Sequence, residues 1–212
     1  MSLFSSIEPV RYEGPETASE FAYRVYDKDR KVLAKRMEEW RRCAVCYWHS
    51  FNWPGQDILG GGTLPRPWLA PTITQEMADE KLEAAFDFFS RLGLPYFTFH
   101  DVDAMATAAT PKEHDRNLKT IVERMQRKMS ATGRKLLWGT ANLFSHPRYA
   151  GGAATSPDPE VFAWAAVQVR ACLEATHRLG GENYVLWGGR EGYDSLLNTD
   201  LKRELDHYGR FL

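Results

Sequence analysis

The sequence predicts an α/β protein that covers an N-terminal arm and about four βα units of a (β/α)8 barrel, and three observations support this fold class. A short apolar or aromatic segment recurs four times, each followed by a loop and then by a longer segment of helical period. Strands that alternate with helices of these lengths form parallel sheets. Residues suited to chemistry fall at the C-terminal ends of all four predicted strands, where (β/α)8 barrels gather their functional side chains.

A doubly wound open sheet is the alternative architecture. It would concentrate functional residues near one switch point rather than spread them over four strand ends. The sequence contains neither G-x-G-x-x-G nor G-x-x-x-x-G-K-S/T, so a nucleotide-binding fold is disfavoured.

The elements are predicted in order along the chain. Residues 1–42 form an irregular polar arm, with a short helix over residues 35–42 that turns Met37 and Trp40 inward. Ser156 is the expected N-cap of the third long helix, with Pro157 at its first position. Residues 43–212 form the barrel half, with strands at 43–51, 96–100, 135–142 and 183–187, and helices at 74–92, 112–130, 157–179 and from about 198.

Composition restricts the class of protein. The chain has 212 residues, somewhat fewer than the roughly 250 of a complete (β/α)8 barrel. Lys plus Arg total 27 and Asp plus Glu total 28, which argues against a partner that is a nucleic acid or a membrane surface. With three cysteines and no visible signal peptide, we expect a reducing, cytoplasmic compartment. Cys43 and Cys46 match C-x-x-C, but we expect buried structural thiols rather than a redox or metal pair.

The segment 100–103 (HDVD) carries the sharpest catalytic signal. A histidine at a strand end can act as a general acid or base near neutral pH. Asp103 lies in the following loop and could accept the ring N–H of His100, which would fix its tautomer. The alternative is a structural His100 beside two solvated acids, Asp101 and Asp103.

Aromatic residues are the second feature. Trp48, Trp138 and Trp187 lie on or at the ends of predicted strands, where they could wall a sugar site or simply pack in the core. Thr140 and Asn142 occupy the end of the third strand. We expect surface or capping roles for the remaining histidines, which are His49, His114, His146, His177 and His207.

Several motifs together resemble xylose isomerase over essentially the whole chain. They are residues 47–51 (YWHSF), 66–68 (RPW), 99–103 (FHDVD), 137–144 (LWGTANLF), 180–193 (GGENYVLWGGREGY) and 197–200 (LNTD). The arm segment 11–14 (RYEG) is similar to that of the longer-armed class of this family.

The resemblance implies a cytoplasmic, usually tetrameric (β/α)8 enzyme. Such enzymes interconvert an aldose and a ketose, D-xylose and D-xylulose or glucose and fructose, by a hydride shift assisted by two divalent metal ions (Mg, Mn or Co). His100 matches the family's ring-opening histidine, and Asp103 matches the carboxylate that orients it. The positions that match sugar-pocket residues are Trp48, Thr140, Phe144 and Trp187.

Two departures from the family pattern bear on activity. Leu59 stands where much of the family has a phenylalanine that reaches into a neighbouring subunit's site. The family's metal ligands, and a lysine that polarises the substrate, would lie beyond residue 212. The chain is therefore expected to be a fragment of an isomerase that is inactive alone. The alternatives are a half-barrel that pairs with a second half, and a non-catalytic sugar-binding or interaction protein.

Overall fold

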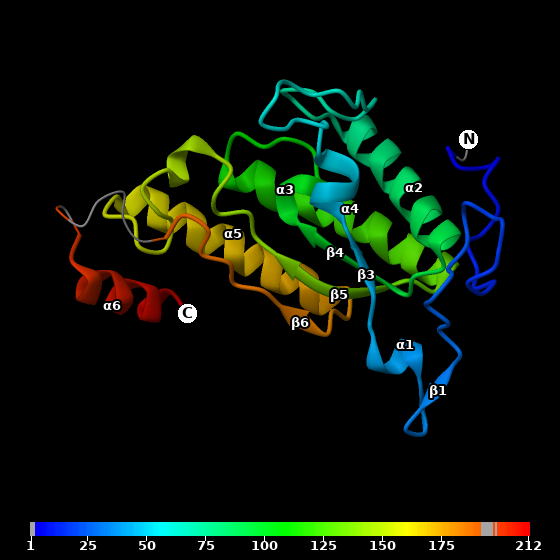
Figure 1. The fold of residues 1–212 in the computed structure, drawn as a ribbon. Helices are drawn as coiled ribbons and strands as arrows, with labels where there is room; N and C mark the ends of the chain where they lie inside the picture. Colours follow the sequence, from blue (N-terminus) through cyan, green and yellow to red (C-terminus); the bar gives the residue numbers. More distant parts are fainter. Residues whose placement is uncertain (1–2, 192–196, 198) are drawn as a thin grey trace.

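The computed structural model describes residues 3–191, 197 and 199–212, and it contains a parallel sheet flanked by helices (Figure 1). Three long helices lie on one face of this sheet and connect its strands. The strands, in spatial order, are β3 (Ala44–Cys46), β4 (Tyr96–His100), β5 (Lys135–Thr140) and β6 (Asn183–Tyr184). The helices are α2 (Gln75–Leu92), α4 (Pro111–Thr132) and α5 (Pro159–Arg178). The predicted parallel α/β architecture is confirmed, and the described strands form an open sheet with β3 and β6 at its edges.

Shorter elements make up the arm and the loops. The arm contains a hairpin of β1 (Lys31–Val32) and β2 (Lys35–Arg36), followed by α1 (Met37–Trp40). The prediction that Trp40 points inward is wrong. Its side chain is half exposed, and its indole N–H donates to the Val32 carbonyl. The remaining elements are η1 (Trp48–Asn52), α3 (Asp101–Ala104), η2 (Pro147–Tyr149) and α6 (Leu201–Phe211).

The ends of α2 and α4 follow their capping residues. The Thr74 hydroxyl accepts a hydrogen bond from the Met77 N–H at the start of α2. Thr110 and Glu113 form a capping box at the start of α4. Both helices end at a glycine in the left-handed conformation, with φ of 66° at Gly93 and 70° at Gly133. The helices predicted at 74–92 and 112–130 are therefore confirmed to within two residues.

The start of α5 differs from the prediction. Asp158 is the N-cap, since its carboxylate accepts from the Glu160 N–H at 2.8 Å, and Pro159 takes the first helical position. Ser156 instead accepts from the Asp158 N–H and lies before the helix. The sequence offers two cap-and-proline pairs, and a carboxylate is favoured further by the positive end of the helix dipole.

Three predicted strands are shorter than expected, and the least changed is β5, which ends at Thr140 rather than at Asn142. The segment 43–51 forms a strand only as far as Cys46, and a π-helical turn, η1, begins at Trp48. Tyr47 and Phe51 are both buried and their rings lie 5.4 Å apart, so this apolar segment has the spacing of a helical turn. Strand β6 ends at Tyr184, three residues before Trp187. The start predicted for the last helix, near Asn198, lies outside the described residues, and α6 begins at Leu201.

The two faces of the sheet have different neighbours. Phe97 points toward the helices, where its ring stacks on Phe89 at 5.4 Å. A Cβ at Gly139 would meet the Thr176 hydroxyl of α5 at 2.4 Å, so β5 approaches that helix closely. Because side chains alternate along a strand, Thr98 and His100 face away from the helices. The polar C-terminal ends of the strands therefore project from the open face.

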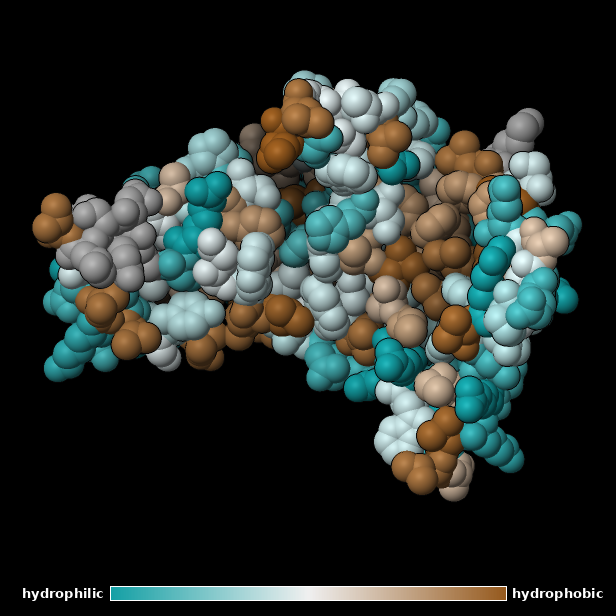
Figure 2. Space-filling model, viewed as in Figure 1, coloured by the Kyte–Doolittle hydropathy of each residue, from teal (hydrophilic) through white to brown (hydrophobic). Residues whose placement is uncertain are grey.

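Hydrophobic side chains also reach the surface at several places in this view (Figure 2). Large exposed examples include Ile58 and Leu59 in the loop after η1, and Leu201 and Leu205 on α6. No helix in the described part of the chain is long and apolar enough to cross a membrane.

Candidate active site

His100 and Asp103 form a buried pair at the end of β4. The chain turns into α3 directly after His100, which brings Asp103 back toward the strand end. The His100 Nδ1 lies 2.5 Å from the Asp103 Oδ2, and the two side chains are 9% and 13% exposed. A carboxylate can only accept, so it favours the tautomer with the proton on Nδ1. The Nε2 atom then keeps a lone pair, and no described residue forms a hydrogen bond with it.

Aromatic rings surround this histidine on the open face of the sheet. The Trp48 ring centroid lies 4.5 Å from that of His100, and the Phe144 ring meets His100 edge-on at 5.4 Å. Trp187 packs edge-on against Phe144 at 4.4 Å, and Trp138 lies 5.5 Å from Trp48. The structure thus brings three of the predicted sugar-pocket residues into one continuous aromatic chain with His100, and Trp138 extends it. Trp187 is about half exposed, so the outer end of this chain faces solvent.

Thr140 is the register partner of His100 on the neighbouring strand. Its side chain is buried, and its hydroxyl donates to the Val185 carbonyl just after β6. The hydroxyl proton is committed to that bond, while the oxygen can still accept. Thr140 therefore lies at the same end of the sheet as the pair, as the sequence predicted.

Asp101 lies at the centre of a polar network that sequence reasoning missed. Its carboxylate is fully buried, so the alternative that made Asp101 a solvated acid is wrong. Oδ1 accepts from the N–H groups of Val102 and Asn142 at 2.8 and 2.9 Å. Oδ2 accepts from His114 Nε2 at 2.8 Å and from Gln168 Nε2 at 2.6 Å. Four N–H donors satisfy this buried charge, so the carboxylate connects the ends of β4 and β5 to α4 and α5.

The surface or capping role expected for His114 is wrong, since its side chain is 5% exposed. One signal could have placed it: His114 lies four residues before the buried Leu118, on the same face of α4. Gln168 likewise lies four residues before the buried Cys172, on the same face of α5. The network ends at Tyr149, whose hydroxyl donates to Gln168 Oε1 at 2.7 Å. Burial raises the pKa of Tyr149, so that hydroxyl stays protonated as a donor.

Lys81 is a further residue near the site that the sequence analysis did not single out. It lies on α2 with 1% of its surface exposed, and its ammonium donates to Asn52 Oδ1 at 2.7 Å and to the Asp103 carbonyl at 2.6 Å. Burial lowers the pKa of Lys81 to about 8, against the opposing pull of the Asp103 carboxylate. Its hydrogen-bond partners are Asp103, which is itself a site residue, and Asn52, which ends the turn that begins at Trp48. Lys81 therefore stabilises two segments that carry site residues.

The other titratable residues singled out in the sequence have mixed outcomes. His146 caps η2 as expected, accepting from the Arg148 N–H at 3.1 Å. His49 and His177 are exposed, also as expected, and His207 is half-buried. Cys172 is buried, but Cys43 and Cys46 are only half-buried free thiols, so the expectation of burial is wrong for that pair.

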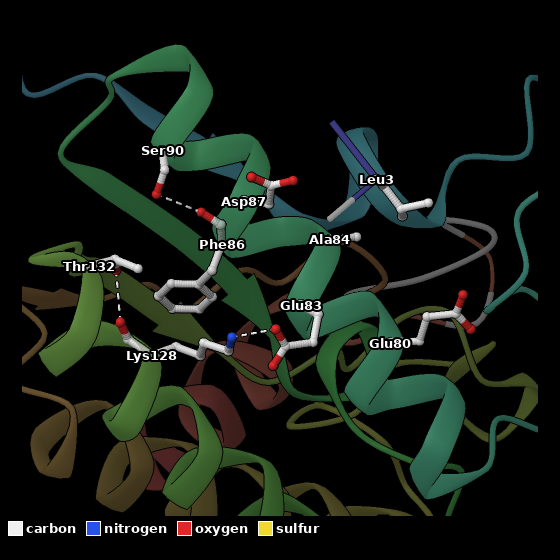
Figure 3. Close-up of a pocket in the computed structure, with 9 residues that line it drawn as sticks. All are labelled: Leu3, Glu80, Glu83, Ala84, Phe86, Asp87, Ser90, Lys128 and Thr132. Atoms are coloured by element: carbon white, nitrogen blue, oxygen red, sulfur yellow. Dashed lines mark hydrogen bonds and ion pairs between the residues drawn. The ribbon is translucent and has the colours of Figure 1, made fainter. Parts of the chain in front are cut away.

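A cavity of about 650 Å³ lies elsewhere, between Leu3 of the arm, α2 and α4 (Figure 3). Figure 3 shows Lys128 reaching across to Glu83, with which it forms an ion pair. The Phe4 N–H donates to Asp87 on the same helix face. Because Glu83 and Asp87 already have these partners, we interpret the cavity as a gap in the packing between the arm and the helices and not as a second candidate active site.

Comparison with known proteins supports the motif resemblance. No protein-family model matches the chain. The chain is 61% identical over all 212 residues to a xylose isomerase of Paraburkholderia phytofirmans, of which it covers 48%. It is 61% identical over 211 residues to a xylose isomerase of Solibacter usitatus and 56% identical over 212 residues to one of Burkholderia multivorans, again with 48% of each covered. The chain spans about half the length of the curated relatives it matches, consistent with an N-terminal half. The resemblance of this chain to the xylose isomerase family is thus confirmed along its entire length.

Proposed function

We propose that this chain carries the ring-opening side of an aldose–ketose isomerase that acts on D-xylose, and on D-glucose by the same chemistry. The observation that carries the proposal is the buried pair of His100 and Asp103, with Nδ1 and Oδ2 2.5 Å apart. The names of the relatives support the isomerase class.

Ring opening requires one proton to move from the anomeric hydroxyl to the ring oxygen. As the bond between C1 and the ring oxygen breaks and the C1 carbonyl forms, Nε2 of His100 takes the hydroxyl proton, and the resulting imidazolium returns a proton to the ring oxygen. Asp103 stabilises that imidazolium and holds the ring in the tautomer that leaves Nε2 free. Residues Trp48, Phe144 and Trp187 form apolar walls for the sugar's C–H faces. The Thr140 oxygen offers an acceptor for a sugar hydroxyl.

The proposal includes two divalent cations, which in this family polarise the oxygens of the open-chain sugar. Within residues 3–191, 197 and 199–212, no three His, Cys, Asp or Glu side chains come together to hold a cation. The described residues therefore do not fit the metal pair, and none is assigned to it. Assembly as a cytoplasmic homotetramer belongs to the same proposal. The proposal assigns no shared subunit wall to Leu59, which is 88% exposed, because a leucine cannot stack on a sugar as the family's phenylalanine does.

Interconversion of the α and β anomers of xylose tests ring opening without requiring isomerisation. We expect the purified chain to accelerate this interconversion, measured by polarimetry or NMR exchange, and His100→Asn to lower the acceleration by about 100-fold. The matched control is His177→Asn, an exposed histidine on α5, which should leave the rate unchanged. Equal rates for wild type and His100→Asn would overturn the ring-opening role.

Ketose formation is the complementary measurement. We expect no xylulose from this chain alone with added magnesium or manganese, since the metal ligands implied by the resemblance are not among its matched positions. Xylulose produced by the chain free of host isomerase would contradict this. Saturable sugar binding without faster anomer interconversion would instead support a non-catalytic sugar-binding half-barrel.

A further inference from the structure

Lys81 is a buried ammonium group that the ring-opening chemistry does not use directly. Its two hydrogen-bond acceptors are a side-chain amide and a backbone carbonyl, at 2.7 and 2.6 Å, and neither is a carboxylate. Burying an ammonium is unfavourable unless its hydrogen bonds are made and its charge is balanced. An uncharged side chain would fill the same space without that cost. The charge at this position therefore calls for a reason other than packing.

The acceptors of Lys81 belong to the two segments that hold His100. Asn52 is the last residue of η1, and the ring of its first residue, Trp48, packs against the His100 ring at a tilt of 47°. Asp103 lies in α3 and binds His100 Nδ1. Asn52 also donates from Nδ2 to the Asp103 carbonyl at 3.1 Å, so Lys81 and Asn52 converge on one oxygen. The Lys81 side chain on α2 thus connects the segment that carries the Trp48 ring to the segment that carries the Asp103 carboxylate.

We propose that Lys81 is a positioning residue for ring opening: its ammonium, with Asn52, locks the Trp48 and Asp103 segments together and so sets the orientation and tautomer of His100. The inference rests on the proposed function for its catalytic meaning. It differs from a purely structural role because it requires the charge and donors of Lys81, and because it acts on His100 in particular.

The charge of Lys81 also has an electrostatic consequence for the pair. Among the described residues, the Asp103 carboxylate is the charged group that acts on Lys81, and Asn52 faces it as a neutral partner. The ammonium therefore attracts the Asp103 carboxylate, whose Oδ2 lies 2.5 Å from His100 Nδ1. Because burial lowers the pKa of Lys81 to about 8, mild alkali removes this cation without a mutation.

The decisive variant is Lys81→Met, which keeps an unbranched side chain one heavy atom shorter and removes its charge and donors. In the purified chain we expect NMR of the ring nitrogens to show His100 changing from one tautomer, protonated at Nδ1, to a mixture. Anomer interconversion should fall by about tenfold with the sugar dissociation constant little changed. Lys81→Arg should restore part of both signals. Lys119→Met, an exposed lysine on α4, is the matched control and should change neither.

A titration keeps the test decisive where Lys81→Met fails to fold. In the wild-type chain, the His100 ring-nitrogen signals should change with a midpoint near pH 8, and this change should be absent in Lys81→Arg. Loss of stability with unchanged His100 signals, or a titration that Lys81→Arg preserves, would overturn the proposal. A His100 that responds to Lys81 in a chain without anomer-interconversion activity would refute the proposed function alone.

Discussion

Asp101 and Asp103 are two residues apart, yet their carboxylates have different surroundings. Asp103 faces one histidine at the open face of the sheet, whereas Asp101 is enclosed by four N–H donors. The turn of α3 separates them, because successive side chains on a helix point about 100° apart. Asp103 is therefore available to reacting atoms, and Asp101 is committed to holding the strand ends together.

Replacement of Asp101 tests that structural role. Asp101→Asn puts an amide NH2 where two N–H donors converge, so at least one donor loses its acceptor. We expect the free energy of unfolding to fall by about 3 kcal/mol, measured by urea denaturation. Asp115→Asn, on the exposed face of α4, is the control and should change stability by less than about 0.5 kcal/mol. A similar loss in the two variants would show that the network contributes little.

Individual helices follow their local signals closely, with α5 as the informative exception. Periodicity places all three long helices, and the glycines after α2 and α4 end them as expected. The N-terminus of α5 is displaced by two residues, because Ser156 and Asp158 are both acceptable caps, each followed by a proline. Local sequence narrows that choice to two positions, and the positive end of the helix dipole favours the carboxylate of Asp158.

The two candidate caps give a direct comparison. Asp158→Ala removes the carboxylate that accepts from the Glu160 N–H and should lower the free energy of unfolding by about 1 kcal/mol. Ser156→Ala removes a weaker contact outside the helix and should cost about half as much or less. Thermal or urea unfolding of the two variants decides the matter. A larger loss for Ser156→Ala would place the cap at Ser156.

The molecule as a whole presents open sheet edges and apolar surface. Strands β3 and β6 each pair on one side only among the described residues, and α6 exposes Leu201 and Leu205. Unpaired edges and exposed apolar side chains favour association. We propose further barrel strands as the partners of these edges, because the chain spans about half the length of the curated relatives that it matches.

Buried ionisable groups give the whole fold a defined pH dependence. The folded-state pKa of Lys81 is about 8, below its ordinary 10.5, so between these values the unfolded chain holds more protons and stability rises with pH. Burial raises the pKa of Tyr47, Tyr149 and Tyr184, so above about pH 10 the unfolded chain loses their protons first and stability falls.

We therefore expect the free energy of unfolding to rise by about 1–2 kcal/mol from pH 8 to 9.5 and to decline above about pH 10. Urea unfolding across this range measures the change. Lys81→Met should lack the rise and keep the decline. A flat profile in the wild type would show that the lysine is hydrated rather than buried.

The sequence by itself determined the order of strands and helices, the ends of α2 and α4, and the pair of His100 and Asp103, because each depends on contacts within a few residues. It also grouped Trp48, Thr140 and Trp187 at strand ends, since parallel strands end at one edge, and the family resemblance added Phe144. Only the tertiary structure decided that residues 48–52 turn, that Asp101 is buried, and that Lys81 supports the site. Those outcomes depend on partners up to 67 residues apart, as for Asp101 and Gln168. The periodicity of apolar residues shows which face of a helix or strand is buried. Which residues contact that face depends on how the elements pack together.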